Sequence, residues 1–274
     1  MLHYQILTVT AFSQNCTLLW DDESREAVLI DAGGEVARLK QAIEQLRRSL
    51  PLKSGRRMSV WQTMIETAEG KPVAVVIHDC EDFDGTPVGI SPRAVLRKVL
   101  QLYEARGWRP VVAPEMEFYL IRQNTNPHEP LRPPSGRAGR SEVGRQSFSI
   151  DAVNDFDPFF QELSAFCEAA QLKVETLIHE VGACQMEINF SHGDAMALAD
   201  QVFLFKRAVR ETAYRHNIFA TFMAKPMEGE PGSAMHIHQS VVDIKTGKNL
   251  FSNPDGSMSE LFMLHIGGLQ KYIP

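Results

Sequence analysis

The sequence predicts an α+β protein in which helices flank a curved antiparallel sheet, preceded by a short α/β segment at the N-terminus. Several short stretches alternate apolar and polar residues, as strands with one buried face do. Between them lie longer stretches with apolar residues at helical spacing. The chain has 274 residues, 44% hydrophobic and 23% charged, which suffices for one large globular domain or two smaller ones.

The first part of the chain predicts three strands and a helix. Residues 4–10, 16–20 and 26–30 have the composition of strands, and residues 31–34 that of a turn. A helix is expected from Glu35, with its apolar positions at Val36, Leu39, Ile43 and Leu46. Residues 47–57 are rich in Lys and Arg and contain Pro51 and Gly55, so we expect a junction there.

The remainder predicts alternating helices and strands. Ser91 and Pro92 form a helix start, and Gly107 a stop. Residues 124–147, rich in Pro, Gly and Arg, predict a long loop. The other expected elements are a strand at 73–77, a strand at 111–121, a helix from Asp157, two strands within 174–189, a helix at 194–216, strands at 220–225 and 233–242, and a helix at 261–272.

Polar groups at every second position mark three of the expected strands, over residues 115–117, 185–189 and 236–240. Alternate strand residues share a face, so each stretch would show a polar stripe opposite an apolar one. The expected apolar positions are Met116, Phe118 and Leu120, then Met186, Ile188 and Phe190, then Met235 and Ile237.

One such stripe is usually a solvated strand face, but several side by side would form a cup of carboxylates and two histidines. Glu180, just before the second stripe, would add a further carboxylate. Oxygen-rich sites with few imidazoles suit Mg²⁺ or Mn²⁺ better than Zn²⁺. These ions commonly carry phosphates, so the stripes point to nucleotide chemistry.

Charge and composition exclude several partners. The net charge of −6 leaves no basic footprint, so a nucleic acid is not expected to bind. No apolar run approaches the ~20 residues of a membrane span, and the first residues lack the pattern of a signal peptide. Four scattered cysteines (Cys16, Cys80, Cys167 and Cys184) predict reduced thiols and a cytoplasmic protein.

Four segments in this order, 113–120, 179–187, 222–227 and 232–240, resemble the glutamine synthetase family, and most closely its γ-glutamylpolyamine (γ-glutamylputrescine) synthetase branch. The resemblance extends over roughly residues 72–274. It implies a glutamine synthetase-type catalytic half-barrel over residues 91–274, incomplete at the C-terminus. Residues 58–90 would be a remnant of the β-grasp domain that precedes it in this family.

The resemblance also implies ligands and a reaction. It implies two divalent ions, one held by Glu117, Glu180 and Glu187 and the other by Glu115 and His236. It further implies contacts of Glu175, His238 and Ser240 with ATP, and of Gly232 with glutamate. In the implied reaction ATP phosphorylates the γ-carboxylate of glutamate, and an amine or ammonia attacks the γ-glutamyl phosphate.

Two departures from the family pattern modify this expectation. Pro231 stands where ammonia-using members have asparagine, which favours the amine-ligating branch without identifying the amine. The family's later catalytic arginines, glutamate flap and one further metal ligand have no counterpart in this sequence. We therefore expect weak or absent turnover from this chain alone. The family forms homo-oligomeric rings, but this chain is not expected to assemble a stable one.

Residues 1–46 resemble a different family, the metallo-β-lactamase-fold hydrolases of the glyoxalase II type, at segments 10–16 and 28–34. The H-x-H-x-D-H zinc motif of that family does not follow, so the resemblance implies no zinc ligand. We interpret residues 47–57 as the junction of two partial genes. A metal-dependent hydrolase and an inactive nucleotide-binding remnant remain the alternative functions.

Overall fold

The computed structural model describes residues 2–9, 14–23, 25–30, 36–49, 63–66, 72–75, 77, 79 and 86–273. The chain divides into two compact units, and each is treated by itself below. The first comprises residues 1–62 with 74–77, and the second residues 63–73 with 78–274.

The first unit is a three-stranded antiparallel sheet with one helix. The strands β1 (Leu2–Val9), β2 (Gln14–Asp21) and β3 (Glu26–Ile30) pair in chain order, and α1 spans Val36–Ser49. A small core joins sheet and helix through Leu7, Leu18, Ala42 and Leu46. The predicted strands and helix are confirmed, although α1 extends three residues into the expected junction. The expected turn at 31–34 and the rest of the junction lie outside the described residues.

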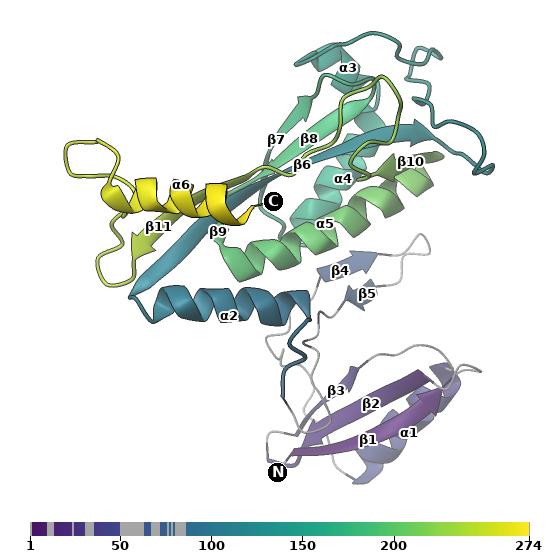
Figure 1. The fold of residues 1–274 in the computed structure, drawn as a ribbon. Helices are drawn as coiled ribbons and strands as arrows, with labels where there is room; N and C mark the ends of the chain where they lie inside the picture. The colour runs from purple at the N-terminus through teal and green to yellow at the C-terminus, as the bar shows by residue number, and fades with distance from the viewer. Residues whose placement is uncertain are drawn as a thin grey trace. The chain divides into compact units, whose positions relative to one another are not determined.

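The second unit is built on a long strand, β6 (Trp108–Arg122), at the centre of an open antiparallel sheet (Figure 1). On one side β6 pairs with β8 (Gln185–Phe190), which pairs with β7 (Val174–His179). On the other side β10 (Ile218–Thr221) and β11 (Ile237–Asp243) pair with opposite ends of β6. The short β9 (Gly193–Asp194) also pairs with β6. This arrangement confirms the predicted fold class. A separate two-stranded sheet joins β4 (Thr63–Glu66) and β5 (Pro72–Val75).

Helices α4 (Asp157–Ala169) and α5 (Ala195–Arg215) lie on one face of this sheet, and α5 packs on β6 and β10 (Figure 1). The Asp194 side chain caps α5 by accepting from the Ala197 N–H, and Asn217 adopts the left-handed conformation just after its end, with φ 57°. The remaining helices are α2 (Pro92–Glu104), α3 (Ile150–Asn154) and α6 (Glu260–Tyr272).

The predicted apolar faces of the first two stripes are confirmed. The rings of Phe118 and Phe190 make edge contacts with Phe205 of α5, at centroid distances of 6.4 and 5.2 Å. The third stripe differs, because Met235 is 51% and Ile237 44% exposed. The strand β11 also begins only at Ile237, so Met235 lies before the strand.

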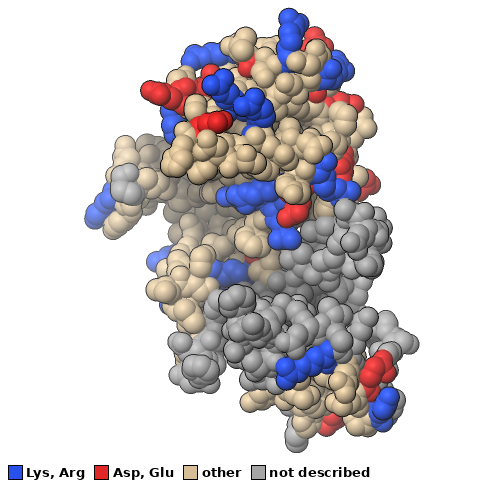
Figure 2. Space-filling view, turned by 90° about the vertical axis from the view of Figure 1, so that its right-hand side faces the viewer, with Lys and Arg blue, Asp and Glu red and all other residues tan. Residues whose placement is uncertain are grey.

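The described surface carries charges of both signs. Basic and acidic side chains both occur on the face that Figure 2 shows, as the modest net charge of −6 leads one to expect. Among the described helices, none combines the length and apolar character that crossing a bilayer requires.

Candidate metal centre

The polar stripes of β6 and β8 share one face of the sheet. In the antiparallel register Glu117 lies opposite Glu187, and Glu115 lies opposite Asn189. Directly opposed residues of such a pair point to the same side, which is the side away from α5 because Phe118 faces that helix. The strand register therefore gathers the predicted acidic ligands of the two strands on one face.

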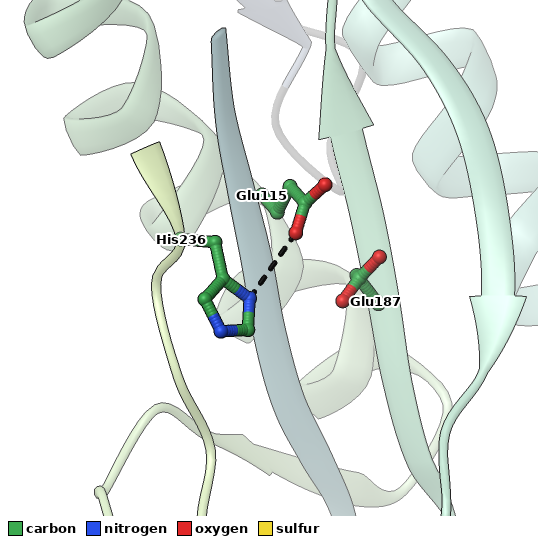
Figure 3. A group of neighbouring side chains, drawn as sticks. All are labelled: Glu115, Glu187 and His236. Carbon is green, nitrogen blue, oxygen red and sulfur yellow. Dashed lines mark ion pairs between the residues drawn. The ribbon is translucent and has the colours of Figure 1, made fainter. Parts of the chain in front are cut away.

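Three side chains meet closely on this face. One ligand atom each of Glu115, Glu187 and His236 lie within 4.8 Å of one another (Figure 3). Glu187 is 6% exposed, whereas His236 comes from the segment just before β11 and has a largely exposed side chain. Two carboxylates and an imidazole at this spacing form a donor set that fits a divalent cation of the Mg²⁺ or Mn²⁺ type.

Both predicted histidines contact Glu115. His236 Nδ1 lies 3.2 Å from Glu115 Oε2, and His238 Nε2 lies 2.6 Å from Glu115 Oε1. His236 directly precedes β11 and His238 lies within it, where the register places His238 opposite Ala113, two residues before Glu115. Each histidine therefore occupies one oxygen of this carboxylate.

Glu117 accepts hydrogen bonds from an amide side chain and from the backbone. Its Oε2 accepts hydrogen bonds from the Gln185 side-chain amide at 2.9 Å and from the Ala234 backbone N–H at 3.0 Å. Its Oε1 lies 3.8 Å from His236 Nδ1. One oxygen is thus occupied by protein donors, and the other is directed towards the histidine.

Electrostatic repulsion acts on Glu187. Burial raises its pKa, and the carboxylates of Glu115, Glu180 and Glu117 raise it further, although a hydrogen bond from Asn189 opposes them. Glu180 follows β7 directly, and its Oε2 accepts from the Val181 N–H at 3.3 Å. A bound cation would relieve this repulsion, which is a second reason why the residues fit a metal.

The predicted nucleotide and substrate residues lie at varied distances from this cluster. Ser240 is two residues beyond His238 on the same face of β11. Gly232 lies in the loop before β11, and its carbonyl accepts from the Gln185 amide. Glu175 is exposed at a register shift in β7, where Ser191 Oγ donates to it at 2.5 Å. Among the described residues, the hydrogen bond of the Glu175 carboxylate is to Ser191 and not to a member of the acidic cluster.

A charged pair beside Glu180 was not predicted. His179 is buried, with Nδ1 2.7 Å from the Glu180 carbonyl oxygen and Nε2 3.1 Å from Glu142 Oε2. Both ring nitrogens face acceptors, an arrangement that favours the doubly protonated ring. Burial alone would lower the pKa of His179, but Glu142 outweighs it and raises the pKa. The same contact lowers the pKa of Glu142 against the effect of burial.

Cys184 also contacts Glu142, through its backbone N–H at 2.9 Å and its Sγ at 3.3 Å. Burial and then the nearby carboxylate raise the pKa of this thiol, so it is not activated as a nucleophile. Cys167 is likewise a free, buried thiol, and burial raises its pKa to about 12. The Glu142–His179 pair therefore anchors the long loop to the β7–β8 turn.

Comparisons with known proteins agree on one family. The family model described as "Glutamine synthetase, catalytic domain" matches residues 89–274. A glutamine synthetase of Pyrococcus horikoshii is 36% identical over 189 residues, which are 69% of this chain and 40% of that protein. The γ-glutamylputrescine synthetase PuuA of Escherichia coli is 34% identical over 196 residues, which are 70% of this chain and 41% of that protein.

A solved structure shows the same fold. The cryo-electron microscopy structure of the Plasmodium falciparum glutamine synthetase superimposes with a TM-score of 0.65 at 20% identity, over 82% of this chain and 50% of that one. The chain spans about 40% of the length of the curated relatives it matches.

Proposed function

Because the chain belongs to the glutamine synthetase family, we propose that its activity is the ATP-dependent ligation of an amine or ammonia to the γ-carboxylate of glutamate. The observation that carries this proposal is the acidic cluster at the sheet face, where Glu115, Glu187 and His236 converge within 4.8 Å. The relatives that support it include both an ammonia-type and an amine-type enzyme by name. The proposal therefore leaves the amine open.

In this proposal each side chain of the cluster binds a metal ion. Divalent ions, Mg²⁺ or Mn²⁺, would neutralise the phosphates of ATP and bring two anionic substrates together. Glu117, Glu180 and Glu187 would hold one ion, and Glu115 with His236 would hold the other. Glu187 has a ligand atom within 4.8 Å of those of Glu115 and His236, so it would adjoin both ion positions. Burial and the neighbouring carboxylates raise the pKa of Glu187, and a cation held there would offset the repulsion between these carboxylates.

The neighbouring residues bind the substrates. His238, Ser240 and Glu175 contact ATP, and the backbone at Gly232 approaches glutamate. A Cβ at Gly232 would lie 2.8 Å from the Ala224 carbonyl oxygen, so only glycine fits this loop as it is folded. ATP first transfers its γ-phosphoryl group to the glutamate γ-carboxylate, which forms γ-glutamyl phosphate. The amine then displaces the phosphate.

We also propose that the protein works in the cytoplasm. The proposed domain bounds are residues 1–46, 47–57, 58–90 and 91–274, and the second and third of these fall largely outside the described residues.

Isothermal titration calorimetry with Mg-ATP tests the proposed function. We expect the wild-type chain to bind Mg-ATP, the Glu187→Ala variant to lose binding, and the exposed control Glu168→Ala on α4 to retain it. Metal binding without any nucleotide affinity would favour a metal-dependent hydrolase instead. Nucleotide binding that survives Glu187→Ala would overturn the assignment of this cluster.

A further inference from the structure

Gln185 forms hydrogen bonds through both ends of its side-chain amide. Its Oε1 accepts from the Gly182 N–H at 3.0 Å and lies 3.1 Å from the Tyr119 hydroxyl oxygen. Its Nε2 donates to Glu117 Oε2 at 2.9 Å and to the Gly232 carbonyl at 3.0 Å. A glutamine amide has two donors and two acceptor positions, so both donors and one acceptor position are satisfied.

These contacts fix the orientation of the amide. The Gly182 N–H can only donate, and it therefore requires the amide oxygen on its side. The amide nitrogen then faces two groups that can only accept, Glu117 and the Gly232 carbonyl. The side chain is 1% exposed, so no water competes for these positions.

The partners of Gln185 come from segments that are distant in the sequence. Glu117 is 68 residues away on β6, and Gly232 is 47 residues away in the loop before β11. The Tyr119 hydroxyl donates to the Pro231 carbonyl at 2.7 Å and so binds the same loop. The backbone at Gly182 approaches so closely that a Cβ there would lie 2.0 Å from the Tyr119 hydroxyl oxygen. Gln185 thus joins a carboxylate of the acidic cluster to the loop of residues 231–234.

We propose that Gln185 is a positioning residue that fixes the Glu117 carboxylate for metal binding and couples it to the 231–234 loop. Together with the Ala234 N–H, Gln185 occupies Oε2 of Glu117, so that Oε1 is the oxygen left to a cation. This inference rests on the proposed function for the role of Glu117 as a ligand. Donors that orient a metal ligand in this way typically contribute ~10–100-fold to metal affinity.

The test compares Mn²⁺ binding by electron paramagnetic resonance in the wild type and in two variants of Gln185. Gln185→Met keeps the size and removes the polar atoms. Gln185→Glu keeps an oxygen that faces the Gly182 N–H and the Tyr119 hydroxyl. It replaces the amide nitrogen by a second oxygen, which can only accept and therefore cannot donate to Glu117. We expect both to weaken Mn²⁺ binding about 10–100-fold, whereas Gln161→Met, which removes an exposed glutamine on α4, leaves it unchanged.

Two further readouts separate positioning from a general loss of stability. The spectrum of the bound Mn²⁺ should change in Gln185→Met, because Glu117 Oε2 loses a donor. Amide hydrogen exchange at Gly182 and Ser233 should become faster in the same variant at equal global stability. Mn²⁺ affinity within about threefold of the wild type, with an unchanged spectrum, would overturn the inference.

The exchange measurement tests the link between Gln185 and the 231–234 loop independently of the proposed function. If the wild type takes up no Mn²⁺, the assignment of the metal ligands fails, and exchange alone then decides the link between Gln185 and the loop. Unchanged exchange at Gly182 and Ser233 in Gln185→Met would in that case overturn the link as well.

Discussion

Replacing Glu187 by glutamine is expected to stabilise the metal-free protein and to abolish its response to Mn²⁺. The ligand oxygens of Glu115 and Glu187 lie within 4.8 Å. At an effective dielectric constant near 20, two unit charges at this separation repel each other by about 3 kcal/mol. The histidines beside Glu115 offset part of this repulsion. We therefore expect Glu187→Gln to raise the free energy of unfolding by about 1–2 kcal/mol at pH 8.

The pH dependence has a definite sign. Burial and the neighbouring carboxylates raise the pKa of Glu187 above its ordinary value of 4.5. The folded state therefore binds this proton more tightly than the unfolded state, and stability declines as the pH rises from 4.5 through the raised pKa. The advantage of Glu187→Gln should be largest above this window and should shrink as the pH is lowered towards 4.5.

Mn²⁺ is expected to reverse the order of stability. At a concentration one hundred times the dissociation constant, a ligand stabilises the folded state by about 2.7 kcal/mol. The wild type should gain this amount, and Glu187→Gln should gain much less because a ligand has been removed.

The assay is urea unfolding in which hydrogen exchange of the β6 and β8 amides is the readout. It is carried out with and without EDTA. This readout reports on the sheet itself and not on the first unit. Glu168→Gln, an exposed change on α4, is the matched control and should leave both stabilities unchanged. The reasoning is refuted if Glu187→Gln destabilises the metal-free protein at pH 8, or if it responds to Mn²⁺ as the wild type does.

Three further predictions follow from other parts of the molecule. Glu142→Gln should lower the free energy of unfolding by about 3 kcal/mol, because it leaves the buried His179 charge unpaired. Urea titrations should find this loss largest between about pH 4.5 and 6.5, the ordinary pKa values of the two groups. The pKa of Glu142 is lowered in the folded state, so its contribution is lost only as the pH falls below this range, and the pKa of His179 is raised, so its contribution is lost only as the pH rises above it. A loss that does not vary with pH would contradict this. Phe205→Ala should cost about 3–5 kcal/mol by the same measurement, because its fully buried ring packs on Phe118 and Phe190, and a cost below 1 kcal/mol would show that α5 does not depend on this contact. Limited trypsin digestion with mass spectrometry should cut first within residues 47–57, and resistance there would count against a junction of two partial genes.

Local sequence patterns predicted most of the described helices and strands and the faces of the central strands, but they did not predict the short elements β4, β9 and α3. The alternation in β6 and β8 placed Phe118 and Glu117 on opposite faces, because strand geometry has a period of two. The ends of elements were less predictable. The strand β10 begins at Ile218 and stops at Thr221, before the end expected at 225, and β11 begins four residues after the expected position 233. Pairing with β6 decides where these strands end. The sequence of a single strand does not show which residues of another strand pair with it.

By itself, the sequence determined the fold class, the alternation of the stripes, the chemical types of the acidic cluster and the resemblance to its family. Only the tertiary structure decided which groups touch. The roles of Gln185, Tyr119 and Glu142 depend on hydrogen bonds between residues 37 to 112 positions apart. The exposure of Ile237 likewise depends on which elements pack against its strand. Periodicity is a local property of the backbone, whereas the satisfaction of a buried polar group depends on segments that meet only when the chain is folded.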